Sequence, residues 1–135
     1  MKRRLWPAVA AFLLLGVSAC SSPDKEEQCE GAFTSVAMAV DGVASATWDC
    51  NFQFGGGWVR SDVVLEAATE EEAIAVVEAL LRAFAASPDL EDGWGTPQEY
   101  AIEDSSIIVG ARDVGFTLGV PNVGEVREKW DITPG

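Results

Sequence analysis

The clearest periodic pattern in the chain lies between residues 69 and 86, where apolar side chains recur every three or four positions. They would form one face of a helix: Ile74, Val77, Leu81 and Phe84, joined by Ala73 and Leu80. Thr69 and Glu72 have the spacing of a capping box, and Ser87-Pro88 ends the pattern. This segment therefore predicts a long helix whose apolar face covers a sheet.

Strand-like patterns lie on both sides of this helix. Residues 43–54 and 58–67 are rich in valine, threonine and aromatic side chains, and Gly55-Gly56-Gly57 between them predicts a hairpin turn. After the helix we expect three short strands, at residues 99–103, 106–112 and 115–120. Asn122 is placed to cap a final short helix over residues 123–130.

The segment from Cys29 to Val40 fits two structures. Phe33, Val36, Ala37 and Val40 have helical spacing, while Thr34, Val36, Met38 and Val40 alternate as in a strand. Asp41-Gly42 suits either outcome: Gly42 would end a helix in a left-handed conformation, or the pair would form a hairpin turn. The helix is the favoured interpretation.

Together these elements predict a single α+β domain over residues 29–135. We expect an antiparallel sheet of about four to five strands, packed by one long helix and one or two shorter ones. The passage from a helix through Asp41-Gly42-Val43 into a hairpin, a second helix and a further strand resembles ferredoxin-like α+β domains. Heavy-metal-binding members of that fold carry two cysteines before the first helix. Here only Cys29 is present, so the resemblance implies no metal function.

The N-terminus has the three zones of an export signal: basic residues 2–4, an apolar stretch over residues 5–16, and small residues before Cys20. The apolar stretch is shorter than the roughly 20 residues that span a bilayer. Leu15-Gly16-Val17-Ser18-Ala19-Cys20 resembles the lipobox of bacterial lipoproteins. The resemblance implies a signal peptide over residues 1–19, an acylated Cys20 and a flexible tether over residues 20–28. Ordinary secretion without Cys20 is the alternative.

The charge and the residue composition exclude several classes of function. Loss of the three basic residues of the signal leaves six of the nine basic side chains against 22 acidic ones, so nucleic acid is not an expected partner. The absence of histidine removes the usual general base and the usual transition-metal ligand. Cys29 and Cys50 predict a disulfide outside the cytoplasm. No catalytic residue, metal site or cofactor is expected.

Two constellations remain as candidate binding sites. The acidic stretch 89–95 has oxygen ligands suited to calcium but not the spacing of an EF-hand loop, so a solvated turn is favoured. Four tryptophans follow the signal: Trp48, Trp58, Trp94 and Trp130. Most are expected in the core, but glycines beside Trp58 and Trp94 make these two the candidate ligand surface. The many carboxylates select no acid–base pair.

These observations predict a non-catalytic binding or accessory module, attached to the bilayer through acylated Cys20 on the extracytoplasmic face of the cell membrane. Its residue bias resembles the small lipoproteins of actinobacteria. The first alternative is a small-ligand or glycan binder that uses exposed tryptophan, and the second is a carboxylate-based hydrolase. A ligand binder should have a pocket lined by Trp58 or Trp94. An accessory subunit should instead show a contiguous apolar surface for an envelope protein.

Overall fold

The computed structural model describes residues 25–53 and 57–135, which form an α+β fold. Three α-helices, α1 (Lys25–Met38), α2 (Glu70–Ala86) and α3 (Val123–Trp130), accompany a four-stranded sheet. Its strands are β1 (Val43–Asn51), β2 (Trp58–Leu65), β3 (Tyr100–Ile102) and β4 (Ile108–Val109). A 3-10 helix, η1, covers Ala111–Val114. The expected fold class is confirmed, and it is consistent with a variant of the ferredoxin-like pattern.

The sheet has the order β1-β2-β3-β4, so each strand lies beside its neighbour in sequence. Strands β1 and β2 form the expected antiparallel hairpin, and β3 and β4 form a second one. Strands β2 and β3 pair in parallel, because α2 carries the chain back across the sheet before β3 begins. The sheet is therefore mixed, and the expectation that it is wholly antiparallel was wrong.

The ambiguous segment is helical. Cys29, Phe33 and Ala37 recur at helical spacing and are buried, and the helix begins at Lys25. Residues 25–28, which we expected in the flexible tether, are thus its first turn. Gly42 follows at φ +96°, and a β-carbon there would lie 2.5 Å from a methyl carbon of Val76. Glycine is required at this turn because both the backbone conformation and the close helix exclude a side chain.

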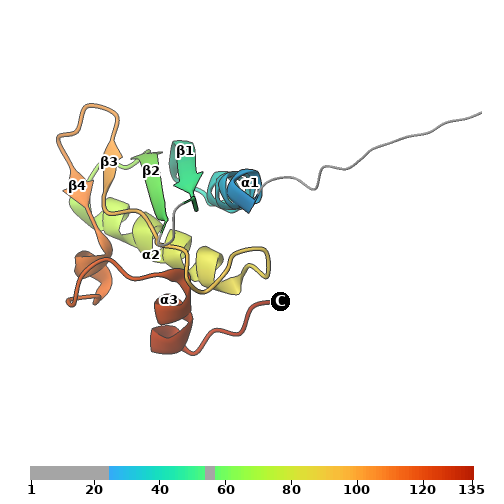
Figure 1. Ribbon diagram of the computed structural model, residues 1–135. Helices are drawn as coiled ribbons and strands as arrows, with labels where there is room; N and C mark the ends of the chain where they lie inside the picture. The colour runs from blue at the N-terminus through green and yellow to red at the C-terminus, as the bar shows by residue number, and fades with distance from the viewer. Residues whose placement is uncertain (1–24, 54–56) are drawn as a thin grey trace, which may run out of the picture.

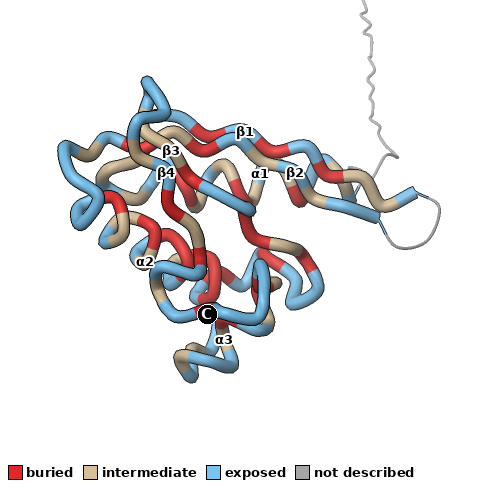
Figure 2. The backbone as a smooth tube through the Cα atoms, turned by 90° about the vertical axis from the view of Figure 1, so that its left-hand side faces the viewer, coloured by how far each residue is buried: buried red, intermediate tan, exposed pale blue. Residues whose placement is uncertain are grey.

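Helix α2 covers the sheet as its pattern predicted. The Thr69 hydroxyl accepts a hydrogen bond from the Glu72 backbone, while the Glu72 carboxylate accepts one from the backbone of Ala68 rather than of Thr69. Figure 1 shows α2 running beneath the strands, with α3 on its far side and α1 beside β1. Figure 2 shows the buried positions of β1 and β2 alternating with exposed ones, so the sheet keeps one face free of helices.

The core centres on Phe33 of α1. Its ring stacks on Trp48 at a centroid distance of 5.0 Å and meets Phe84 of α2 edge-on at 5.3 Å. The predicted disulfide joins Cys29 to Cys50 beside these rings and links α1 to β1. The first helix, the hairpin and α2 are therefore held together by one aromatic cluster and one covalent bond.

The C-terminal part departs further from the expected strands. Residues 106–112 form the two-residue strand β4 and then enter η1, and residues 115–120 form a loop rather than a strand. Gly115 and Gly119 have φ values of +104° and +112°, which interrupt an extended chain at two points. The final helix is confirmed at its expected bounds, with a reciprocal capping box between Asn122 and Glu125.

Candidate binding surface

The structure separates the two tryptophans that were expected to form a ligand surface. Trp94 is only 6% exposed, because it packs between Phe33 and Phe52, 6.1 and 5.8 Å away by ring centroid. Its assignment as a surface residue was therefore wrong: the neighbouring glycines let the loop fold inward instead of opening the ring to solvent. Trp48 is buried as well, and Trp130 is half-buried against Phe116.

Trp58 is exposed at the start of β2, with 38% of its surface free. The guanidinium of Arg60 lies 4.2 Å from the centre of its ring, on the same face of the strand. One face of the ring is therefore occupied by a cation. With Trp94 in the core, no second exposed tryptophan among the described residues completes a pair of rings around a ligand.

The acidic stretch 89–95 is organised by an arginine from α3. Arg127 donates hydrogen bonds to the backbone carbonyls of Ala85, Ser87 and Leu90 and to the carboxylate of Asp92. Its side chain is only 12% exposed. The Arg127 guanidinium therefore occupies the place where the carbonyl and carboxylate oxygens of this stretch would attract a cation. Within residues 25–53 and 57–135 no group of three or more metal-ligating side chains converges.

Two carboxylates of α1 have a structural use. Glu26 and Glu30 accept hydrogen bonds from the backbone N–H groups of Phe52 and Cys50, along the outer edge of β1. They take the place of the carbonyls of a further strand and protect this edge. Elsewhere, hydrogen bonds from Ser106 to its exposed carboxylate hold the pKa of Asp104 below its usual range. This environment keeps a carboxylate ionised rather than poised to exchange a proton.

A contiguous apolar surface lies at the other end of the molecule. Three large side chains are strongly exposed there: Ile108 at 50%, Leu118 at 102% and Val120 at 46%. We call these three residues the apolar corner. Ile108 and Val120 line the same hollow of about 290 Å³, and Leu118 and Val120 line an adjoining one of about 330 Å³. Neither hollow is lined by Trp58 or Trp94.

Loop 115–121 positions this surface. Phe116 turns inward and contacts Trp130, with ring centroids 5.2 Å apart, which anchors the loop on α3. The hydroxyl of Thr96 donates to the carbonyl of Pro121 and fixes the other end. Between these anchors Leu118 is left wholly in solvent. A loop that is held at both ends presents its apolar tip in a defined place, as a contact surface requires.

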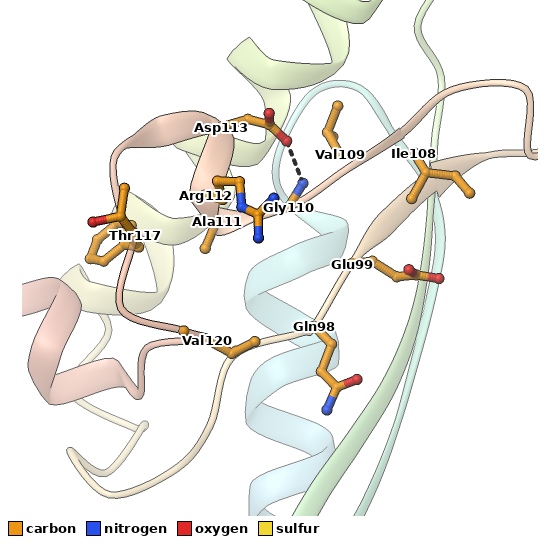
Figure 3. Close-up of a pocket in the computed structure, with 12 residues that line it drawn as sticks. Gln98, Glu99, Ile108, Val109, Gly110, Ala111, Arg112, Asp113, Thr117 and Val120 are labelled. Carbon is orange, nitrogen blue, oxygen red and sulfur yellow. Dashed lines mark hydrogen bonds between the residues drawn. The ribbon is translucent and has the colours of Figure 1, made fainter.

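Polar groups surround the first hollow (Figure 3). The carboxylate of Asp113 accepts a hydrogen bond from the backbone of Gly110, at 2.9 Å, and steadies η1. Arg112 lies beside it, and among the described residues it has no ion-pair partner. Gln98 and Glu99 line the opposite wall. An apolar centre with a polar rim is the usual composition of a protein contact surface.

The sequence contains a signal for this loop, although the apolar spacing alone favours a strand. Phe116, Leu118 and Val120 alternate with polar or small residues, which favoured a strand. The two glycines flanking Leu118 were the contrary indication, because an edge strand seldom tolerates two breaks within six residues. A strand would have faced these side chains to the core, whereas the loop turns only Phe116 inward.

In comparisons with known proteins, no protein-family model, no curated protein and no solved structure matches this chain. Over the described ranges, none of the helices has the length and hydropathy needed to cross a bilayer. The lipobox-like sequence with Cys20, and the predicted signal before it, lie outside the described residues.

Proposed function

We propose that this chain is a lipid-anchored, extracytoplasmic protein that serves as a non-catalytic accessory module and binds an envelope protein through the apolar corner. The anchor rests on the lipobox-like sequence before Cys20. The strong excess of acidic residues supports a domain that stands away from anionic head groups. The disulfide between Cys29 and Cys50 fits an oxidising compartment.

The observation that carries the accessory role is the apolar corner. Leu118 is exposed at 102% beside one hollow, and Val120, also exposed, lines that hollow and the one that Ile108 lines. Exposed aliphatic surface of this kind is typical of a protein contact site. Its partner should present an aliphatic or aromatic side chain for the hollows and basic groups for the acidic domain around them. The alternative of a glycan binder is weaker, because Trp94 is buried in the core and only Trp58 remains exposed as a candidate stacking surface.

The anchor is tested separately from the surface. Cys20→Ala should either leave a precursor that retains residues 1–19 or release the protein from the membrane; the mass of the product and its detergent-phase partitioning together distinguish these outcomes. Cys29→Ala with Cys50→Ala is the matched control, because it removes two cysteines without touching the lipobox. A Cys20→Ala protein that loses residues 1–19 and still partitions into detergent would contradict the anchor while leaving the apolar corner untouched.

A further inference from the structure

The central hairpin strand β2 has an unpaired edge. Strand β3 pairs with β2 at only two positions, Val64 with Ala101 and Leu65 with Ile102. Towards the start of β2 the two segments diverge. A hollow of about 410 Å³ opens between residues Val59, Arg60 and Ser61 on one side and Gln98 and Glu99 on the other. We call this hollow the β2 slot. Gln98 and Glu99 also line the first hollow, with Ile108 and Val109 of β4 (Figure 3).

The register shows which backbone groups face the β2 slot. Cys50 donates its N–H to Glu30, away from β2, so the pair formed by Cys50 and Val59 is not hydrogen-bonded. Hydrogen-bonded and open pairs alternate in an antiparallel ladder, and no bulge interrupts β1 from Ser45 onwards. Trp48 and Ser61 therefore form the next open pair. The N–H and C=O groups of Val59 and Ser61 thus point away from β1 and into the β2 slot.

Nothing in the described part of the chain pairs with these backbone groups. No backbone or side-chain hydrogen bond joins Val59 or Ser61 to residues 98–99. The contrast with the outer edge of β1 is informative, because there Glu26 and Glu30 satisfy the outward N–H groups. The outer edge of β1 is thus closed by the protein's own carboxylates. The edge of β2 that faces residues 98–99 is left open, although β2 lies between β1 and β3 in the sheet.

From this geometry we propose that the β2 slot is a strand-addition site for an extended, basic segment of a partner protein. Alternating donors and acceptors along one strand edge match the main chain of an extended peptide. Arg60 also lines the slot, but its guanidinium lies over the Trp58 ring. Glu99 lines the opposite wall, and Asp62 follows Ser61 on β2; neither carboxylate has an ion-pair partner among the described residues. Lysine or arginine in the added strand would meet the Glu99 carboxylate in the slot, and a second basic residue two positions along the strand would lie towards Asp62.

The β2 slot adjoins the first hollow but would bind its partner in a different way. The two regions share the wall formed by Gln98 and Glu99, but the slot faces β2 while the hollow of Figure 3 faces β4 and η1. An extended peptide in the slot would bind chiefly through main-chain hydrogen bonds, and the apolar corner would bind through burial of aliphatic surface. The experiment can therefore separate them.

The test uses a fluorescent peptide of alternating lysine and valine, about six residues long as an average strand is, titrated against the folded domain by anisotropy. Its matched control carries N-methyl groups on alternate residues, which block main-chain donation but keep every side chain. We expect the methylated peptide to bind at least about tenfold more weakly, because two main-chain hydrogen bonds are lost. A glutamate–valine peptide should also bind at least about tenfold more weakly, because the charge match is lost.

Protein variants locate the binding. Ser61→Pro removes one N–H in the slot but leaves the ladder with β1, and Ser61→Thr is its control; we expect only the proline to weaken binding. Leu118→Asp should leave peptide affinity unchanged. Equal affinity for the methylated peptide, no measurable binding of the parent peptide, or loss of binding in Leu118→Asp would each overturn the proposal. If Ser61→Pro does not fold, the methylated peptide on the unaltered protein decides alone.

Discussion

The two ends of this molecule are held in different ways. The part built from α1, the β1–β2 hairpin and α2 has a disulfide and a cluster of stacked rings at its centre. The part from Thr96 to the C-terminus has a two-residue strand, a short 3-10 helix and a loop, and it is tied to the rest by Arg127. Exposed aliphatic side chains gather in the second part, where irregular backbone allows them. The first region therefore has the contacts that stabilise the fold, and the second has the surface that we propose for recognition.

The largest expected loss of stability comes from removing the disulfide of the first region. Cys29→Ala with Cys50→Ala should lower the free energy of unfolding by about 3 kcal/mol, because a loop of this length restrains the unfolded chain. Urea denaturation without reductant measures the loss. Reduction of the unaltered protein is the control and should reproduce most of it. A double variant as stable as the oxidised protein would show that the rings alone hold this region.

Arg127 is the corresponding point in the second region. Arg127→Ala removes the side-chain donor from the carbonyls of Ala85, Ser87 and Leu90, of which Ser87 keeps only the Leu90 backbone N–H, and we expect a loss of about 2 kcal/mol. Arg127→Lys keeps the charge but not the fork of donors and should recover only part of it. Lys25→Ala, which removes an exposed ion pair to Glu91 in the same acidic stretch, should cost less than about 0.5 kcal/mol. Equal losses for Arg127→Ala and Lys25→Ala would refute the structural role.

A smaller effect concerns Tyr100, the one tyrosine of the chain, which is fully buried at the start of β3 in the second region. Its hydroxyl has no hydrogen-bond partner among the described residues, and burial raises the pKa of this group far above its ordinary value. Tyr100→Phe removes an unsatisfied polar atom and should raise the free energy of unfolding by about 1 kcal/mol at neutral pH.

The pH dependence provides its control. Tyr100 must stay protonated in the fold, while the unfolded chain ionises near pH 10, so the unaltered protein should lose stability as the pH rises above about 10. The difference between Tyr100→Phe and the unaltered protein should therefore widen in that range. A constant difference, measured by urea denaturation at neutral and alkaline pH, would mean that the hydroxyl reaches solvent.

The smallest expected effect on stability is at the apolar corner. Leu118→Asp should change the free energy of unfolding by less than about 0.5 kcal/mol, because a side chain exposed at 102% makes no packing contact. Leu81→Asp, in the core face of α2, is the contrasting variant and should prevent folding. Thermal denaturation of both measures the difference. A large loss for Leu118→Asp would mean that the loop contributes to the core rather than to recognition.

The sequence predicted the regular elements well because each had a local signal. Helix α2 had a cap and an apolar face, α3 had Asn122, and Gly42 marked the end of α1. The disulfide followed from cysteine count and compartment. The class of the fold and the hairpin came from periodicity and turn residues.

The errors share a physical cause, since they depend on contacts that are distant in sequence. Trp94 is buried by Phe33 and Phe52, which precede it by more than forty residues. The parallel pairing of β2 and β3 depends on the path of α2 across the sheet. The backbone carbonyls that accept hydrogen bonds from Arg127 of α3 lie at and after the end of α2. Apolar alternation at residues 116–120 was ambiguous because periodicity does not distinguish a strand from a loop with two left-handed glycines.

The most direct test of the central claim is site-specific photocrosslinking from position 118 of the full, anchored protein in intact cells. The account predicts one crosslinked product with an envelope protein, lost when Val120→Asp disrupts the neighbouring surface. A crosslinker at Ala75, exposed on α2, serves as the control and should yield no such product. The same product from both positions, or one that persists in Val120→Asp, would contradict an accessory module that docks through the apolar corner.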